Sequence, residues 1–179
     1  PLFQPEGNHI LSQARKHPQL GKIVLMSDGA LIEHSFIATM GDLARGMYFV
    51  GPSSATTPRS EALAKIYLAA FKTMPANSYY QSGFDAASLL FQAIERAAVR
   101  QDDGGLVLGR EALRRALYAM ADVDGVTGRL NCDRFGDCAS PAFNVLRLDN
   151  PAAGVEGLKR NIQFFHAPRH PPASAAPAT

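Results

Sequence analysis

The sequence lacks several features that would indicate particular classes of protein. No apolar run approaches the roughly 18 residues of a membrane span, which excludes a transmembrane helix. Lysine and arginine number 18 against 16 acidic residues, and no basic run exceeds a pair such as Arg15–Lys16 or Arg114–Arg115. Because a nucleic-acid partner calls for a basic stretch, none is expected, and these pairs are better explained as solvated surface.

Motifs of catalysis and phosphate binding are also missing. The chain has no Gly-x-Ser-x-Gly, no Gly-x4-Gly-Lys and no Gly-x-Gly-x-x-Gly sequence. The five histidines are scattered at positions typical of a surface: His9, His17, His34, His166 and His170. His166 and His170 have a spacing that suits a metal, but Pro168 breaks the helix that would align them. We therefore expect neither an enzyme nor a site for a metal or cofactor.

The two ends of the chain carry little that predicts a core. The chain starts without Met, in a loop that leads into a helix, so we interpret it as a processed or excised segment. The missing signal peptide then says little about compartment. Residues 166–179 are rich in Pro, Ala and Ser, which predicts a disordered tail.

The first 50 residues predict a strand-helix-strand unit. We expect a helix over residues 8–20, a buried strand at 22–26, a helix over 32–43 and a second buried strand at 47–50. One face of the helix at 32–43 carries the apolar residues Ile32, Phe36, Met40 and Leu43. This order predicts an α/β fold in which the two strands are parallel.

The middle of the chain predicts three further helices. They are expected over residues 60–74, 82–100 and 110–120, after a Ser-, Thr- and Pro-rich connection at 51–58. The longest helix carries five apolar residues at spacings of three and four, and this face is predicted to be core: Phe84, Ala87, Phe91, Ile94 and Ala98.

A β-hairpin is expected next. Residues 129–132 form an extended run, residues 133–137 have the composition of a turn, and residues 143–148 would be the returning strand. The only two cysteines, Cys132 and Cys138, flank this turn.

In a paired arrangement, Cys132 and Cys138 would lie at about the separation that a disulfide needs. Closing so small a loop would contribute roughly 2–2.5 kcal/mol. A bond would favour an oxidising compartment. The alternative is two free thiols in a reduced protein, whereas a metal site is not expected because no His or third Cys lies nearby.

Asp28 is the best single candidate for ligand binding. It follows the first predicted strand, and open α/β sheets bind ligands beyond the carboxyl ends of their strands. A carboxylate there can pair with an ammonium group, although Asp28–Gly29 also has the composition of a plain turn. Tyr79 and Tyr80 stand in a predicted connection, where their rings could cover an apolar ligand or simply pack within the loop.

Three stretches resemble a known family when taken together. Gly83-Phe84-Asp85-Ala86-Ala87 resembles a Tyr-Asp-Ala-Ala helix, and Asp124 to Gly128, followed by Asp133 and Gly136-Asp137, resembles a Gly-x-x-Gly...Phe-Asp...Gly-Asp signature. Pro1 to Gly7 is similar to a Pro-Leu-Phe-x-Pro-Glu-Gly segment. Their order and spacing resemble the branched-chain amino-acid binding proteins of ABC importers, from Pro1 to about Phe165.

This resemblance implies a type I periplasmic binding-protein fold, with two Rossmann-like lobes that close on a ligand. It implies that the chain is only about the C-terminal half and is therefore incomplete. Residues 1–50 would belong to the second lobe, residues 51–139 to the first lobe, and residues 140–165 would return to the second. Apolar faces exposed by the truncation could make the chain dimerise or swap elements.

The resemblance also assigns site residues. Asp28 matches an acidic residue that contacts the ligand's amino group, and Tyr79 matches an aromatic residue of the side-chain pocket, with Tyr80 and Phe84 as weaker neighbours. Asp28 replaces the Glu of some members, which shortens the reach. The Cys132 and Cys138 pair is not part of the family pattern but fits a periplasmic setting.

We therefore expect a solute-binding component of an ABC importer, in the periplasm or lipid-anchored outside the cell. It would bind a branched-chain amino acid, or a related small amino acid or amide, and a membrane permease. One alternative is a ligand-sensing regulator of the same fold, which a cytoplasmic location and reduced cysteines would favour. The other is an α/β enzyme, whose turnover would depend on Asp28.

Overall fold

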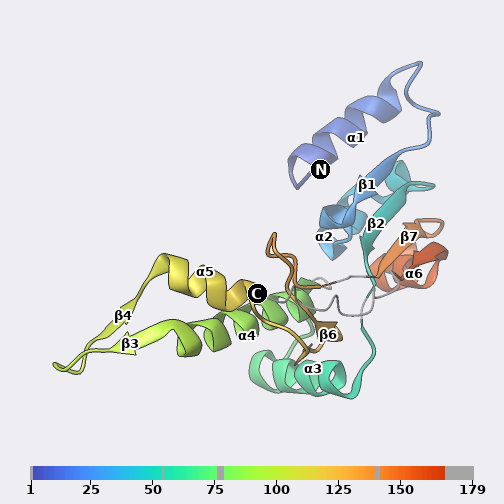
Figure 1. Ribbon diagram of the computed structural model, residues 1–179. Coiled ribbons are helices and arrows are strands. Elements are labelled where there is room, and N and C mark those ends of the chain that lie inside the picture. The colour runs from blue at the N-terminus through green and yellow to red at the C-terminus, as the bar shows by residue number, and fades with distance from the viewer. Residues whose placement is uncertain (1, 54, 76–78, 140–141, 168–179) are drawn as a thin grey trace. The chain divides into compact units, whose positions relative to one another are not determined.

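The computed structural model describes residues 2–53, 55–75, 79–139 and 142–167 (Figure 1). The chain divides into two compact units. Unit 1 comprises residues 1–53 and 141–179, and unit 2 comprises residues 54–140. That these units are the two lobes of a periplasmic binding protein stays a prediction.

Unit 1 is built on a four-stranded sheet. Its helices are α1 (Glu6–Lys16), α2 (His34–Met40) and α6 (Gly154–Arg160), with 3-10 turns η1 (Gly29–Leu31), η2 (Gly41–Ala44) and η3 (Pro151–Ala153). Its strands are β1 (Met26–Asp28), β2 (Tyr48–Pro52), β7 (Phe143–Arg147) and β8 (Ile162–His166), in the spatial order β1-β2-β7-β8. β1 and β2 are parallel, as predicted, whereas β7 is antiparallel to both of its neighbours. The α/β class is confirmed, but the sheet is mixed rather than parallel.

The strand predicted at residues 22–26 is wrong in position. β1 starts only at Met26, and the preceding Ile23 and Val24 are exposed, Val24 by 74%. Met26 pairs with Tyr48, the first residue of β2, so residues 22–24 have no strand beside them. Because an apolar run is buried in a sheet only where a neighbouring strand continues, this run stays on the surface.

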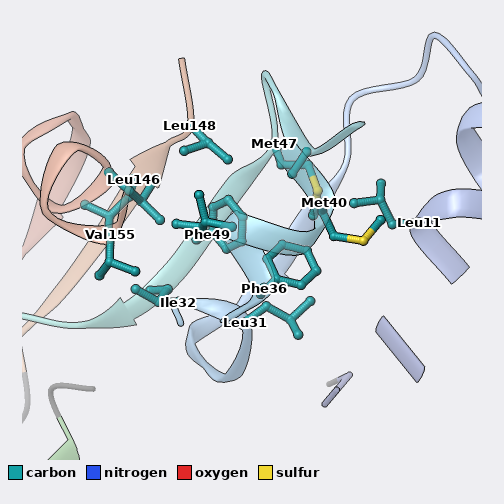
Figure 2. Close-up of a cluster of buried hydrophobic side chains, with 13 residues drawn as sticks. Leu11, Leu31, Ile32, Phe36, Met40, Met47, Phe49, Leu146, Leu148 and Val155 are labelled. Atoms are coloured by element: carbon teal, nitrogen blue, oxygen red, sulfur yellow. The ribbon is translucent and has the colours of Figure 1, made fainter. Parts of the chain in front are cut away.

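The hydrophobic core of unit 1 lies between its helices and the sheet, as Figure 2 shows. Phe36 of α2 and Phe49 of β2 are fully buried, and their rings meet edge to face with centroids 6.1 Å apart. Of the predicted helical face, Ile32, Phe36 and Met40 are buried as expected, but Leu43 is exposed because α2 already ends at Met40. The remaining members of the core lie on α1, η1, α2, η2, β7 and α6, or directly beside β2 and β7: Leu11, Leu31, Ile37, Ala44, Met47, Leu146, Leu148, Val155 and Leu158.

Unit 2 is mainly helical. Its helices are α3 (Pro58–Phe71), α4 (Tyr79–Ala97) and α5 (Arg110–Tyr118). Its strands form two short antiparallel pairs, β3 (Ala98–Arg100) with β4 (Leu106–Leu108), and β5 (Val123–Asp124) with β6 (Arg129–Leu130). α4 packs on α5, and between them lies a small core of Leu89, Ala93, Met120 and Leu130.

The hairpin predicted over residues 129–148 is wrong in its pairing. β6 pairs with β5, which precedes it, and β7 instead joins the sheet of unit 1. The turn between residues 133 and 137 is present, closed by the Asp133 N–H, which donates to Asp137 O at 2.9 Å. A disulfide joins Cys132 and Cys138 across this turn, and both residues pack against the core of unit 2.

The face of α4 predicted to be core is also wrong. Phe84 and Phe91 are exposed by 44% and 65%, whereas the buried residues of α4 are Gln81, Asp85, Leu89 and Ala93. The buried stripe lies on another side of the helix and begins with two polar residues. Apolar spacing alone cannot find such a stripe, because polar residues become suitable for burial only when specific partners satisfy them.

Among the residues that the structure describes, no helix is both long enough and apolar enough to cross a membrane. The expected disordered tail at 166–179 lies outside the described residues, apart from Ala167 and from His166, which ends β8.

The core of unit 1 predicts a contrast between two phenylalanines of one sheet. Phe49→Ala should lower the free energy of unfolding by about 3–5 kcal/mol, because a fully buried ring leaves a cavity. Phe164→Ala on β8, whose ring is exposed, should cost less than about 1 kcal/mol. Urea denaturation followed by circular dichroism measures both, and equal losses would contradict the assignment of the core.

Candidate functional site

Asp28 lies at the carboxyl end of β1, where the predicted site was expected. It pairs in register with Val50 of the parallel strand β2, which continues to Pro52, so the carboxyl ends of both strands lie on the same edge of the sheet. The Asp28 Oδ1 atom accepts a hydrogen bond from the Ala30 N–H at 3.1 Å and caps η1. The side chain therefore makes the contact of a turn residue, which was the alternative interpretation of Asp28–Gly29.

The second carboxylate oxygen of Asp28 has no hydrogen-bond partner among the described residues, and the residue is only partly buried. Gly51 of β2 is closely packed, because a Cβ atom there would come within 2.8 Å of Ile32 Cδ1 and 3.5 Å of the Cα atom of Gly29, the residue after Asp28. An ionised carboxylate with one free oxygen can accept a charge-assisted hydrogen bond from an ammonium group. The turn contact and a ligand contact are thus compatible.

The predicted aromatic site residues all belong to α4 in unit 2, so Phe84 is helical as predicted, whereas Tyr79 and Tyr80 do not stand in a connection as expected. Tyr79 and Tyr80 form the first turn of the helix, and Phe84 follows one turn later. The Tyr80 ring packs against Tyr67 of α3 with centroids 6.1 Å apart, and its hydroxyl accepts a hydrogen bond from Gln81 Nε2 at 3.3 Å. Tyr79 and Phe84 are each 44% exposed. Tyr80 thus packs on α3, and part of the surface of Tyr79 and of Phe84 is open to solvent.

A residue with no predicted role, Asp85, is a buried polar group of unit 2 that makes three hydrogen bonds. It is only 4% exposed, and its carboxylate accepts hydrogen bonds from the N–H groups of Val126 at 2.7 Å and Thr127 at 2.9 Å. The Thr127 hydroxyl donates a third bond at 2.5 Å. Gly125 permits this approach, since a Cβ there would lie 2.7 Å from Asp85 Oδ2. Two of the three stretches that carried the resemblance, around residues 85 and 125, are therefore in direct contact.

A second set of hydrogen bonds connects the segment before α3 to the start of α4 and to the loop at 125–128. The side chain of Gln81 accepts from the Ala55 N–H at 3.0 Å and donates to Ala55 O at 3.2 Å. Thr57 caps α3 by accepting from the Ser60 N–H, and its hydroxyl donates to Val126 O at 3.1 Å. Ser60 forms the other half of this capping box. The start of α3, the start of α4 and the loop at 125–128 form one connected network.

The residues that the structure describes do not form a metal site. No group of three or more His, Cys, Asp or Glu side chains is arranged to hold an ion there. His9, His17, His34 and His166 are all exposed, and His170 lies outside the described residues.

The Asp85 contacts predict a stability difference between two substitutions. Asp85→Asn replaces one acceptor oxygen by an NH2 group and leaves the donors of Thr127 unpaired, so the free energy of unfolding should fall by about 2–4 kcal/mol. Asp124→Asn is the matched control, because its exposed ion pair with Arg59 is worth about 0–1 kcal/mol. Chemical denaturation measures both, and similar losses would show that Asp85 is no more important than a surface carboxylate.

Comparisons with known proteins agree on one fold. The Leu/Ile/Val-binding protein BraC3 of Rhizobium johnstonii is 26% identical over 148 residues, which cover 82% of this chain and 37% of that protein. The leucine-binding protein LivK of Thermotoga maritima has a TM-score of 0.61 at 24% identity, over 83% of this chain and 40% of that one. A solute-binding protein of an ABC transporter from R. palustris, solved in complex with benzoate, has a TM-score of 0.50 at 24% identity, over 73% and 34%.

The chain thus spans about two fifths of the length of these relatives. The two solved structures show the fold, the named relatives are binding proteins, and the resemblance found in the sequence is confirmed. The sequence model of one family, described as periplasmic binding protein, matches residues 5–151. Because this match takes in most of the chain, the chain belongs to the periplasmic binding protein family.

Proposed function

We propose that this chain is part of the solute-binding component of an ABC importer and that its ligand is a branched-chain amino acid or a related small amino acid or amide. The observation that carries the proposal is the placement of Asp28, at the strand edge of a periplasmic binding-protein fold with one carboxylate oxygen unpaired. Membership of the family supports the transport role. The relatives whose names mention leucine, isoleucine and valine support the ligand class.

The chemistry of Asp28 favours a ligand that carries an ammonium group. A partly buried carboxylate paired with an ammonium makes a charge-assisted hydrogen bond, which is roughly twice as strong as a neutral one. The η1 cap holds the side chain in one orientation, so little rotamer entropy is lost when the ligand binds. Tyr79 and Phe84 are proposed to cover the apolar side chain of the ligand when the two lobes close.

The disulfide supports an extracytoplasmic setting for this function. Disulfides persist in oxidising compartments such as the periplasm and are rare in the bacterial cytosol. A periplasmic or lipid-anchored receptor would deliver its ligand to a membrane permease. A cytoplasmic regulator of the same fold would instead keep Cys132 and Cys138 reduced, so the bond weighs against that alternative.

An aromatic carboxylate is the second candidate ligand, because one structure of the same fold was solved with benzoate. Such a ligand has no ammonium group, and Asp28 would repel its carboxylate. The two candidates therefore predict opposite effects of removing the charge of Asp28.

Calorimetric titration of the complete protein with leucine, isoleucine, valine and benzoate tests the proposal. Asp28→Asn keeps the oxygen that accepts from Ala30 and removes the charge, so it should weaken amino-acid binding by about 10- to 100-fold without loss of the η1 cap. Asp42→Asn is the matched control, a charge loss in the same unit at an exposed ion pair, and should change affinity less than about twofold.

Two outcomes of this titration would contradict the proposed ligand. If Asp28→Asn strengthens benzoate binding and no amino acid binds, the ligand is an aromatic acid. If no member of the panel binds the unmodified protein, neither ligand class holds, and Asp28 serves only as the cap of η1.

The exposed face of α4 offers a second test. Phe84→Ala should weaken ligand binding by about 5- to 50-fold, because it removes apolar contact with the ligand. Phe91→Ala, two turns further along the same helix and also exposed, should leave affinity unchanged. Calorimetry measures both variants, and equal effects would mean that Phe84 does not line the site.

A further inference from the structure

The β3–β4 hairpin presents an exposed apolar surface that no described residue covers. Figure 1 shows the hairpin continuing from α4 and returning into α5, beyond the ends of both helices. Val99 of β3 is 61% exposed, Val107 of β4 is 50% exposed, and Leu106 and Leu108 beside it are exposed as well. Three large apolar side chains in succession on a surface strand are unusual for an isolated edge.

The backbone of β4 also has hydrogen-bonding groups that face away from β3. The Gln101 N–H donates to Gly105 O at 2.8 Å, so the next pair inward, Arg100 with Leu106, is not hydrogen-bonded, and the pairs alternate from there. Val99 and Val107 therefore bond to each other, while the N–H and C=O groups of Leu106 and Leu108 point outward. None of the described residues makes a hydrogen bond to those groups.

The two edges of the hairpin differ in how they are protected. Natural sheets protect open edges with charged residues, and β3 carries Arg100. β4 is Leu-Val-Leu and carries no charge. The open edge suited to pairing with another strand is therefore that of β4.

We propose that β4 is a self-association surface, at which β4 of a second copy of this chain pairs antiparallel across a two-fold axis at Val107. In this register Leu106 of each copy is opposite Leu108 of the other, and the outward N–H and C=O groups of both residues are satisfied. The two hairpins form one four-stranded sheet. Because each copy uses the same edge, the assembly closes as a dimer.

The charges around the hairpin are complementary in this register. The turn at its tip is acidic, with Asp102 and Asp103, and its base carries Arg110 at the start of α5. A two-fold antiparallel pairing brings the tip of one hairpin to the base of the other, so that Gly104 of one copy lies opposite Arg110 of the next. Asp103 is then a neighbour of Arg110 across the interface, an attraction that also selects antiparallel over parallel pairing.

Cysteine cross-linking of the full chain tests this register. The two native cysteines are bonded to each other, so Val107→Cys introduces the one free thiol. Residues at the two-fold axis form a non-hydrogen-bonded pair with Cα atoms about 4.5 Å apart, which suits a disulfide. Under mild oxidation most of the Val107→Cys chain should become a covalent dimer on a non-reducing gel.

Val99→Cys is the matched control, because Val99 is at least as exposed in the same hairpin but lies on the protected edge. It should give less than about a tenth of the dimer formed by Val107→Cys. Adding Leu108→Lys to Val107→Cys should reduce cross-linking to the level of this control, since an edge lysine opposes strand pairing.

Sedimentation velocity of the unmodified chain gives an independent readout. A weight-average mass that rises with concentration, and that falls back to the monomer in Leu108→Lys, supports the dimer. Equal cross-linking of Val99→Cys and Val107→Cys, or a monomer at every concentration, overturns the proposal. If the chain is a monomer at every concentration, the apolar edge of β4 instead serves to bind a different macromolecule, such as a membrane partner.

Discussion

The buried carboxylate of Asp85 is the interaction on which unit 2 depends. One side chain in the middle of α4 accepts from two backbone N–H groups and a hydroxyl of the loop at 125–128. A charged group that is only 4% exposed is tolerated because these donors replace the water that it loses. The loop in turn holds Thr57, which caps α3. The helices of this unit are therefore positioned by polar contacts as much as by its small apolar core.

The position of Asp85 also explains why α4 was predicted with the wrong face inward. Phe84 and Phe91 follow the spacing of an amphipathic helix, and the sequence contains nothing that marks Gln81 and Asp85 as buried. Their partners lie about 25 and 40 residues away along the chain, so their burial is decided by tertiary contacts. The motif around Asp85 identified the family correctly, but its physical role could be seen only in the structure.

Other predictions succeeded or failed for comparable reasons. The βαβ order of unit 1 follows from local apolar spacing, and Phe36 and Met40 are buried as that spacing predicts. The strand at 22–26 and the hairpin at 129–148 required knowledge of the partner strand. A short apolar segment does not contain that information, because pairing is set by which strands the fold brings together.

The candidate ligand site was likewise only partly predictable from the sequence. A general rule on strand ends placed Asp28 at the carboxyl edge of β1, and the structure has it there. The cap that it forms on η1 is the turn role expected from its composition. Its proposed second role depends on the oxygen that the cap leaves unpaired, which no sequence pattern reveals. Tyr79 was proposed from its place in the sequence and from the resemblance, Phe84 from the resemblance alone, and the partial exposure of both on α4 is compatible with that role.

A crystal structure of the complete protein grown with leucine would test the central claim most directly. The account predicts that the ammonium nitrogen of the ligand lies within about 3.2 Å of a carboxylate oxygen of Asp28, while the other oxygen still accepts from the Ala30 N–H. A ligand bound with its ammonium group on another residue, or bound away from the carboxyl end of β1, would contradict it.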